Sequence, residues 1–420
     1  MLSMLRRAAI CGVATLGLAG LLAGPALAVE VRLAAPDEAR AILSGAYDDY
    51  FDQMSPADPA IRLLSETPVP VAALRDAYAQ AARGFTTRER DLLTTLIDGE
   101  RARIAKLARW LPETVVIVGA GPVVEGGLAH TRAHAIVFPT GPQGQPVAPP
   151  KPGDAGTPAQ RPQPAPGRPD AGSPPRQTGP GPGSADGPKG AQPDAAARTE
   201  ARPATTSPQT TATAVEPTAA PGLIARRAAD GTLVELFYHE LFHVLSRHNR
   251  AARDELYALI GFEPCGTFDL PAPYAGRRIT NPDAPVNAHY LPVTVDGVPT
   301  KVVPLLYAVS RTYDPMRRPP GFAGQFRTGF MAVRHTGGRC EAVNGRDGTA
   351  RLYRTDDLDD LYDRIGRNTQ YTIHPEEILA DNFALLMTGK RPRDAWVPEA
   401  LADWLGVPAT IGAVDLLTLD

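Results

Sequence analysis

The chain has 420 residues and a formal net charge of −3, and 43% of its residues are hydrophobic. A chain of this length and hydrophobic content can bury a core of its own, in one large domain or in two of medium size. Because the net charge is slightly negative, the composition favours neither nucleic acid nor an anionic membrane surface as a partner.

The first residues, 1–28, have the three parts of a secretory signal peptide. Residues 6–7 are arginines, residues 8–22 form an apolar run, and Ala-Leu-Ala at 26–28 matches a cleavage site. The alternative is a single membrane anchor, but the apolar run is short for a span. We therefore expect an exported protein, periplasmic or secreted, with no transmembrane segment after signal removal.

Export bears on how the cysteines pair. Of the three cysteines, Cys11 leaves with the signal peptide, and the mature protein keeps Cys265 and Cys340. An isolated pair in an oxidising compartment usually forms a disulfide. The alternative is two buried free thiols.

The segment 29–140 begins with helices. Helical periodicity runs from Asp37 to about Arg109. Within it, Thr86 and Glu89 match a capping box, in which the side chain of each residue bonds the backbone N–H of the other. This pattern predicts the start of a long helix.

Two strands are predicted next, at 113–118 and 133–138. Gly119 and Gly121 lie between them, directly after a strand. The third glycine of a dinucleotide-binding fingerprint would fall at Val124, and no helical pattern follows. The two glycines therefore indicate the turn of a β-hairpin.

Residues 141–221 are mainly proline, glycine, alanine, threonine, glutamine and aspartate. Such a segment cannot offset its loss of conformational entropy by burying apolar surface, so we expect a disordered insertion. It can act as a wall-spanning spacer, as an arm for an envelope partner, or as a tolerated surface insertion. It separates the N-terminal helices and strands at 29–140 from a C-terminal part at 222–420.

The C-terminal part, 222–420, contains two well-defined helices. One is predicted at 233–248 and the other at 375–388, where a proline suits the first helical turn. Turns and strands are predicted between them, from 268 to about 333, with an Asp-Gly hairpin turn at 296–297.

The first of these helices carries His239-Glu240-Leu241-Phe242-His243. Residues four apart share a helix face, so both imidazoles can bind one metal ion. Glu240 then lies beside the open position of the metal, where water binds. One Zn²⁺ ion lowers the pKa of that water to about 7, and Glu240 can transfer its proton to the leaving amine. The alternative is a pair of core histidines with satisfied hydrogen bonds.

Zinc needs a third protein ligand, and the sequence offers three candidates. His248 follows His243 by five residues, which turns it off the shared face at 3.6 residues per turn. Asp269 ends a Gly-Thr-Phe-Asp segment that partly matches the aspzincin pattern. Glu377 lies on the second helix, and Asp381 follows it one turn later, where it can fix the orientation of a ligating imidazole.

Glu377 and Asp381 together resemble the Glu-x-x-x-Asp pattern of the gluzincins, the thermolysin-like zinc peptidases. The resemblance implies that Glu377 binds zinc with His239 and His243, and that Asp381 holds one of these histidines by its far ring nitrogen. It also implies an α+β, zincin-like metalloprotease domain. In such domains an edge strand that pairs with substrate precedes the active-site helix, and residues 132–138 occupy that place.

The resemblance covers two short parts of the chain. The long gap between them would make the region from 268 to 333 a β-rich insertion. Gluzincins also use a tyrosine or a histidine to stabilise the oxyanion. Tyr371, His374 and His289 are candidates; His374 can instead cap its helix, and Tyr371 is our expectation.

The sequence therefore predicts an exported zinc metallopeptidase that cleaves a peptide or protein substrate. Two alternatives remain open. One is a zinc hydrolase of a non-peptide amide or ester of the cell envelope. The other is a non-enzymatic envelope protein with a structural metal, which usually has four protein ligands.

Overall fold

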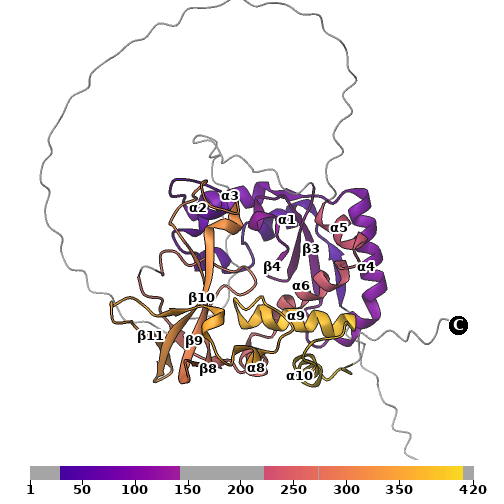
Figure 1. The fold of residues 1–420 in the computed structure, drawn as a ribbon. Helices are drawn as coiled ribbons and strands as arrows, with labels where there is room; N and C mark the ends of the chain where they lie inside the picture. The colour runs from indigo at the N-terminus through magenta and orange to yellow at the C-terminus, as the bar shows by residue number, and fades with distance from the viewer. Residues whose placement is uncertain (1–28, 142–221, 273, 410–420) are drawn as a thin grey trace, which may run out of the picture. The chain divides into compact units, whose positions relative to one another are not determined.

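The structure is a computed structural model that describes residues 29–141, 222–272 and 274–409 (Figure 1). The predicted signal peptide, with Cys11, and nearly all of the proline-rich segment lie outside the described residues. The described residues on both sides of that segment belong to one compact unit. This unit contains helices and sheets, which confirms the α+β class. In this part of the chain, no helix combines the length and the apolar composition that a membrane crossing requires.

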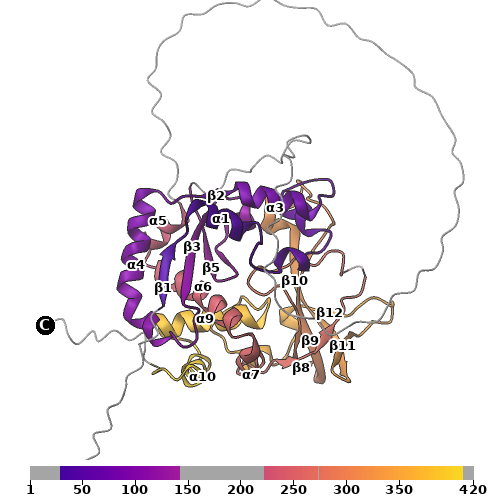
Figure 2. The same ribbon diagram turned by 180° about the vertical axis from the view of Figure 1, so that it is seen from behind.

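The first sheet has the strand order β1-β3-β5-β4. β1, β3 and β5 run parallel, β4 is an antiparallel edge strand, and the short β2 pairs with β3 (Figure 2). The bounds are Glu30–Leu33 for β1, Ala82–Arg83 for β2, Thr114–Ala120 for β3, His130–Arg132 for β4 and Ala135–Pro139 for β5.

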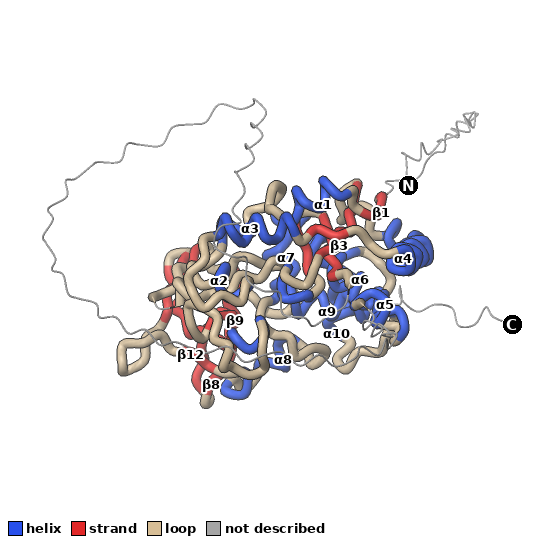
Figure 3. The backbone as a smooth tube through the Cα atoms, turned by 90° about the horizontal axis from the view of Figure 1, so that it is seen from above, coloured by secondary structure: helices blue, strands red, loops and turns tan. Residues whose placement is uncertain are grey.

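Strand β3 contributes to two hydrophobic cores. Val115 and Ile117 pack with α4, α6 and α9, whereas Val116 and Val118 pack with α1 and α3. Successive side chains of a strand point to opposite faces, so helices cover this sheet on both sides (Figure 3). The helices are α1 (Pro36–Leu43), α3 (Val71–Gln80), α4 (Thr87–Lys106), α6 (Leu233–His248) and α9 (Pro375–Thr388).

The predicted capping box starts α4. Thr86 Oγ1 accepts a hydrogen bond from the Glu89 N–H at 3.3 Å, and Glu89 Oε2 accepts one from the Thr86 N–H at 3.0 Å. Two of the N–H groups at this helix end thus have partners, as the sequence predicted.

The predicted hairpin at Gly119 is wrong. β3 and β5 are parallel, and Gly119 lies inside β3, opposite Phe138. A Cβ atom on Gly119 would lie 2.6 Å from the carbonyl oxygen of Arg83. The glycine therefore permits the close approach of β2 to β3, and a close approach by a distant segment has no local signal.

The edge strand was also misplaced. Of the predicted range 132–138, most forms β5, which lies between β3 and β4, and the edge is β4. The chain reverses at Ala133 and His134, so that Arg132 pairs with Ala135. Ala133 has a φ of 49°, which non-glycine residues rarely adopt. An alanine at this position therefore does not indicate a turn.

The β-rich region forms a second sheet, with the order β6-β8-β9-β10-β11-β7 and β12 beside β10. The Asp-Gly turn at 296–297 joins β8 to β9 as predicted, with positive φ at both residues. The bounds are β6 Glu263–Pro264, β7 Thr267–Phe268, β8 His289–Val295, β9 Val298–Ala308, β10 Phe326–Thr336, β11 Arg339–Ala342 and β12 Leu352–Tyr353.

The disulfide between Cys265 and Cys340 is confirmed, with a Cα–Cα distance of 5.2 Å, so the free-thiol alternative is wrong. Both cysteines are buried in a small hydrophobic cluster at the edge where β7 pairs with β11.

Helices α6 and α9 have the predicted bounds and pack against each other. Pro375 is the first residue of α9, and Gly389 ends the helix in the left-handed conformation, with a φ of 65°. The remaining helices are α2 (Asp58–Arg62), α5 (Leu223–Ala229), α7 (Arg253–Ala258), α8 (Leu361–Ile365) and α10 (Trp396–Leu405). Short 3₁₀ helices are η1 (Tyr50–Gln53), η2 (Val124–Gly127), η3 (Arg250–Ala252), η4 (Phe322–Gln325) and η5 (Thr355–Asp357).

The two ends of the proline-rich segment meet at one place on the fold. A Cβ atom on Gly222 would lie 3.0 Å from the carbonyl oxygen of Gly141. We predict that replacing residues 142–221 with a flexible linker of about ten residues leaves cooperative unfolding intact. Each halving of the loop length lowers the entropic cost of closing the loop by about 0.6 kcal/mol. The Tm of the shortened protein should therefore stay level or rise. Calorimetry checks this, and a non-cooperative or much lower transition would show that the segment packs.

Candidate metal centre

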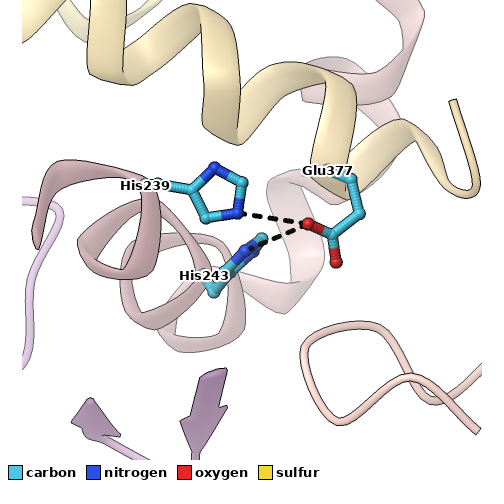
Figure 4. A group of neighbouring side chains, drawn as sticks. All are labelled: His239, His243 and Glu377. Carbon is cyan, nitrogen blue, oxygen red and sulfur yellow. Dashed lines mark hydrogen bonds and ion pairs between the residues drawn. The ribbon is translucent and has the colours of Figure 1, made fainter. Parts of the chain in front are cut away.

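Helices α6 and α9 bring three side chains to one point. His239 Nε2 lies 3.2 Å from Glu377 Oε2, and His243 Nε2 lies 3.6 Å from the same oxygen (Figure 4). Two ligands bound to a tetrahedral zinc at about 2.0–2.1 Å lie about 3.3–3.4 Å apart. The spacing of these atoms therefore fits a zinc ion between them.

Two buried atoms beside this point have no hydrogen-bond partner among the described residues. They are His243 Nε2 and Glu240 Oε2. An unsatisfied buried polar group costs about 1–3 kcal/mol, and more if it is charged. A metal ion bound by His243, with a water molecule hydrogen-bonded to Glu240, would satisfy both atoms.

Asp381 orients His239 in the way the sequence predicted. Asp381 Oδ1 lies 2.8 Å from Nδ1 of His239, and the Thr369 hydroxyl donates to Asp381 Oδ2. With Nδ1 donating, the proton-free Nε2 of the neutral ring can face a metal. Burial alone would lower the pKa of His239, but the hydrogen bonds to Asp381 and Glu377 raise it to about 10.

Glu376 does the same for His243, and the sequence analysis missed it. Its Oε1 lies 3.2 Å from His243 Nδ1, while Oε2 accepts hydrogen bonds from Ser246 Oγ, at 2.7 Å, and from the Tyr257 hydroxyl. Burial opposes its charge, but the His243 hydrogen bond and the nearby Arg253 lower the pKa of Glu376 to about 2. A signal existed: two ligating imidazoles need two acceptors, and Glu376 directly precedes Glu377.

The loop from Thr280 to Asp283 also reaches the site. Asn281 donates from Nδ2 to Glu377 Oε1, which leaves Oε2 of that carboxylate toward the two histidines. Asp283 Oδ1 accepts hydrogen bonds from Thr131 on β4. No sequence pattern indicated this loop, because its position depends on contacts with segments far away in the chain.

A buried ionic cluster anchors that loop. Arg62 is only 3% exposed and pairs with Asp58 and Glu125. It also donates to the carbonyl oxygen of Thr280, while Asp58 accepts from the Thr280 N–H at 3.0 Å. Because each charge has a partner, the cluster can be buried, and it fixes the start of the loop.

Glu240 lies on a cleft of about 830 Å³ beside the three metal-binding candidates. Its side chain is buried, and burial together with the charge of Asp283 raises its pKa to about 8. The cleft residues that concern the site are His239, Glu240, Asp283, Tyr371, Glu377 and Asp381.

The other two candidates for the third ligand lie elsewhere. His248 is exposed at the last turn of α6. Asp269 has a side chain that is 78% exposed and pairs with Arg339. Neither belongs to the group of side chains that the structure brings together around His239, His243 and Glu377.

The three residues predicted as candidates for stabilising the oxyanion lie in different surroundings. His374 caps α9, where Nδ1 accepts from the Glu376 N–H at 3.1 Å. His289 pairs with Asp254, with Nε2 2.8 Å from Oδ1. Tyr371 is the one of the three that lines the cleft with Glu240, and it is 46% exposed.

Comparison with models of known protein families finds no match, and searches of curated proteins and of solved structures likewise find no significant similarity. The geometry of the site is therefore the ground for a functional proposal.

The raised histidine pKa values lead to a prediction about metal affinity. Without metal, His239 has a pKa of about 10, and that of His243 is also raised, against its burial, by the charges of Asp283 and Glu377. With this pKa, His239 carries a second ring proton at neutral pH, which a metal must displace. Raising the pH removes this competition, so zinc affinity should rise about tenfold per pH unit for each proton released. Chelator competition at pH 6, 7 and 8 measures the slope; affinity that is independent of pH would contradict the prediction.

Proposed function

We propose that this chain is a zinc-dependent metallopeptidase of the gluzincin type, built on a zincin-like domain. The observation that supports this most is the convergence of His239, His243 and Glu377 beside the unpartnered carboxylate oxygen of Glu240. A hydrolytic zinc site of this type needs two imidazoles, one carboxylate ligand and a separate acid that lines a cleft.

The number of ligands favours a catalytic metal over a structural one. The group around Glu377 has three members, and among the described residues no cysteine or further histidine belongs to it. Structural zinc sites usually have four protein ligands, whereas catalytic sites keep one position for water or substrate. A zinc ion held by His239, His243 and Glu377 supplies Lewis acidity, which polarises the substrate carbonyl and makes water easier to deprotonate.

Glu240 is suited to the proton transfers. Its pKa of about 8 in the metal-free protein lies close to neutral pH, and a nearby cation lowers the pKa of a carboxyl group. Glu240 thus takes a proton from the attacking water and returns it to the leaving amine. Tyr371 lines the same cleft, and in this proposal its hydroxyl donates to the developing oxyanion.

The cleft favours a peptide as the substrate. It is large, and Leu128, Leu223 and Leu236 give it an apolar wall next to the polar site. An extended chain with apolar side chains fits such a surface. Profiling against peptides and against cell-envelope amides and esters distinguishes a peptidase from a hydrolase of non-peptide bonds.

The disulfide supports an oxidising compartment. Bonds such as Cys265–Cys340 are rare where thiols are kept reduced. We therefore propose that residues 1–28 direct export and that the mature protein is periplasmic or secreted. An envelope protein remains the proposed partner of the segment at 142–221.

We predict that Glu240→Gln binds zinc normally and has no measurable hydrolysis. Glutamine has nearly the same shape but cannot accept the proton from water. Zinc content by atomic emission and cleavage of a peptide mixture by mass spectrometry test the two halves. Cleavage at the parent rate would exclude Glu240 as the base.

We predict that Glu377→Ala loses zinc on dialysis, whereas Asp269→Ala and His248→Ala keep it. The last two are matched controls, because they remove the other candidate ligands. Asp381→Asn should weaken zinc by about 10–100-fold, the usual effect of a group that orients a ligand. Full zinc retention in Glu377→Ala, with loss in either control, would overturn the gluzincin-type assignment.

A further inference from the structure

Asp283 is a cleft residue that the proposed mechanism does not use. Its side chain is only 7% exposed, and it lines the cleft with Glu240. Potential ligand atoms of Asp283, Glu240 and His243 all lie within 4.8 Å of one another. A second carboxylate therefore lies next to the reacting position.

One oxygen of Asp283 is satisfied and the other is not. Oδ1 accepts from the N–H and the hydroxyl of Thr131, at 2.6 and 2.7 Å. Among the described residues, Oδ2 accepts no hydrogen bond, and no lysine or arginine pairs with the carboxylate within 4.0 Å. Arg247 comes near but donates to the Thr131 hydroxyl, at 2.9 Å, and to backbone carbonyl oxygens such as that of Pro282, at 3.1 Å.

Asp283 also connects the cleft to the edge strand β4. The Thr131 N–H that it binds belongs to the edge strand β4, and Arg247 binds the Ala133 carbonyl oxygen just beyond. Its neighbours Pro282 and Ala284 line a separate cavity of about 160 Å³. Asp283 therefore occupies the Thr131 N–H, and a peptide beside β4 cannot pair with this N–H group.

The charge at this part of the cleft selects the peptide terminus that it can bind. Among the described residues, Glu240 Oε2 is buried without a hydrogen-bond partner, and the Asp283 carboxylate accepts hydrogen bonds at Oδ1 alone. Both residues are at least nine-tenths buried. An ammonium group brings three donors and a positive charge, whereas a terminal carboxylate would be repelled. Resting on the peptidase function proposed above, we propose that Asp283 binds the free amino terminus of a peptide, and that the enzyme removes residues from this end.

The distances in a peptide agree with this arrangement. The amino nitrogen and the carbonyl carbon of one residue are about 2.5 Å apart, from standard bond lengths and angles. An ammonium group bound to Asp283 thus brings the first peptide carbonyl into the region between Asp283 and Glu240, whose oxygens lie within 4.8 Å of each other. The rest of the substrate extends along the wall formed by Leu128 and Leu223.

The test compares peptides with and without a free amino terminus. A mixture of defined hexapeptides is incubated with the zinc-loaded protein, beside the same mixture acetylated at the amino terminus. We expect sequential loss of the first residue, and kcat/KM at least about tenfold lower for the acetylated peptides, from loss of a charge-assisted hydrogen bond. Efficient cleavage of acetylated peptides, or cleavage at internal bonds, overturns the inference but leaves the peptidase function standing.

Asp283→Asn is the matched variant. The asparagine carbonyl oxygen can still accept both bonds from Thr131, while the unpartnered oxygen becomes an uncharged NH₂ group. We expect kcat/KM for free peptides to fall about 10–100-fold, zinc content to stay constant, and acetylated peptides to be little affected. Asp98→Asn, on the exposed face of α4, controls for the loss of a negative charge. An unchanged preference in Asp283→Asn contradicts the assignment.

A binding experiment gives a readout that does not depend on turnover. Leucinamide and N-acetylleucinamide are titrated into the zinc-loaded protein and followed by NMR. Leucinamide alone should bind, and Asp283→Asn should abolish this. If leucinamide does not bind, the inference is wrong, whatever the peptidase assays show. If the purified protein neither binds zinc nor cleaves any peptide, the proposed function fails as well.

Discussion

Helices α6 and α9 bury acidic and basic side chains against each other, and a buried charge is stable only when it has a partner. Glu377 Oε2 lies within 3.6 Å of an imidazole nitrogen from each of His239 and His243. This shared oxygen joins the two helices at the centre of the site, and the groups around it are arranged to keep it there.

Helix α9 supplies an acceptor for the far nitrogen of each imidazole. Asp381 holds His239, and Glu376 holds His243. In the sequence, one acceptor precedes Glu377 by one residue and the other follows it by one helical turn. A single rigid helix therefore positions three carboxylates. Rigidity of this kind matters because a metal site depends on the position of each ligand within a fraction of an ångström.

The loop at 280–283 connects the site to the rest of the fold. The cluster around Arg62 fixes Thr280, Asn281 binds the Glu377 carboxylate, and Asp283 binds the edge strand. The charges of the Arg62 cluster would be costly to bury without partners. Together they hold the polar loop at 280–283 in place beside the cleft. The same loop contributes Asp283 to the lining of the cleft.

Local sequence patterns determined the parts of this protein that depend on neighbours along the chain. Helical periodicity and capping residues predicted α4, α6 and α9, and a spacing of four placed His239 with His243 and Glu377 with Asp381 on common faces. These features follow from the geometry of one helix. The Asp-Gly turn is equally local, because it needs only two residues with positive φ.

Only the tertiary structure decided which segments meet. The structure has a parallel strand pair where a hairpin was predicted at Gly119, and its edge strand is His130–Arg132. Both differ from the prediction because strand order depends on long-range packing. Asn281 and Asp283 have no local pattern, since their roles arise where a loop crosses β4 and α9. Sequence spacing identified the metal-binding candidates because a helix is a local structure. The position of the loop at 280–283 depends on contacts between distant residues, which no local sequence pattern encodes.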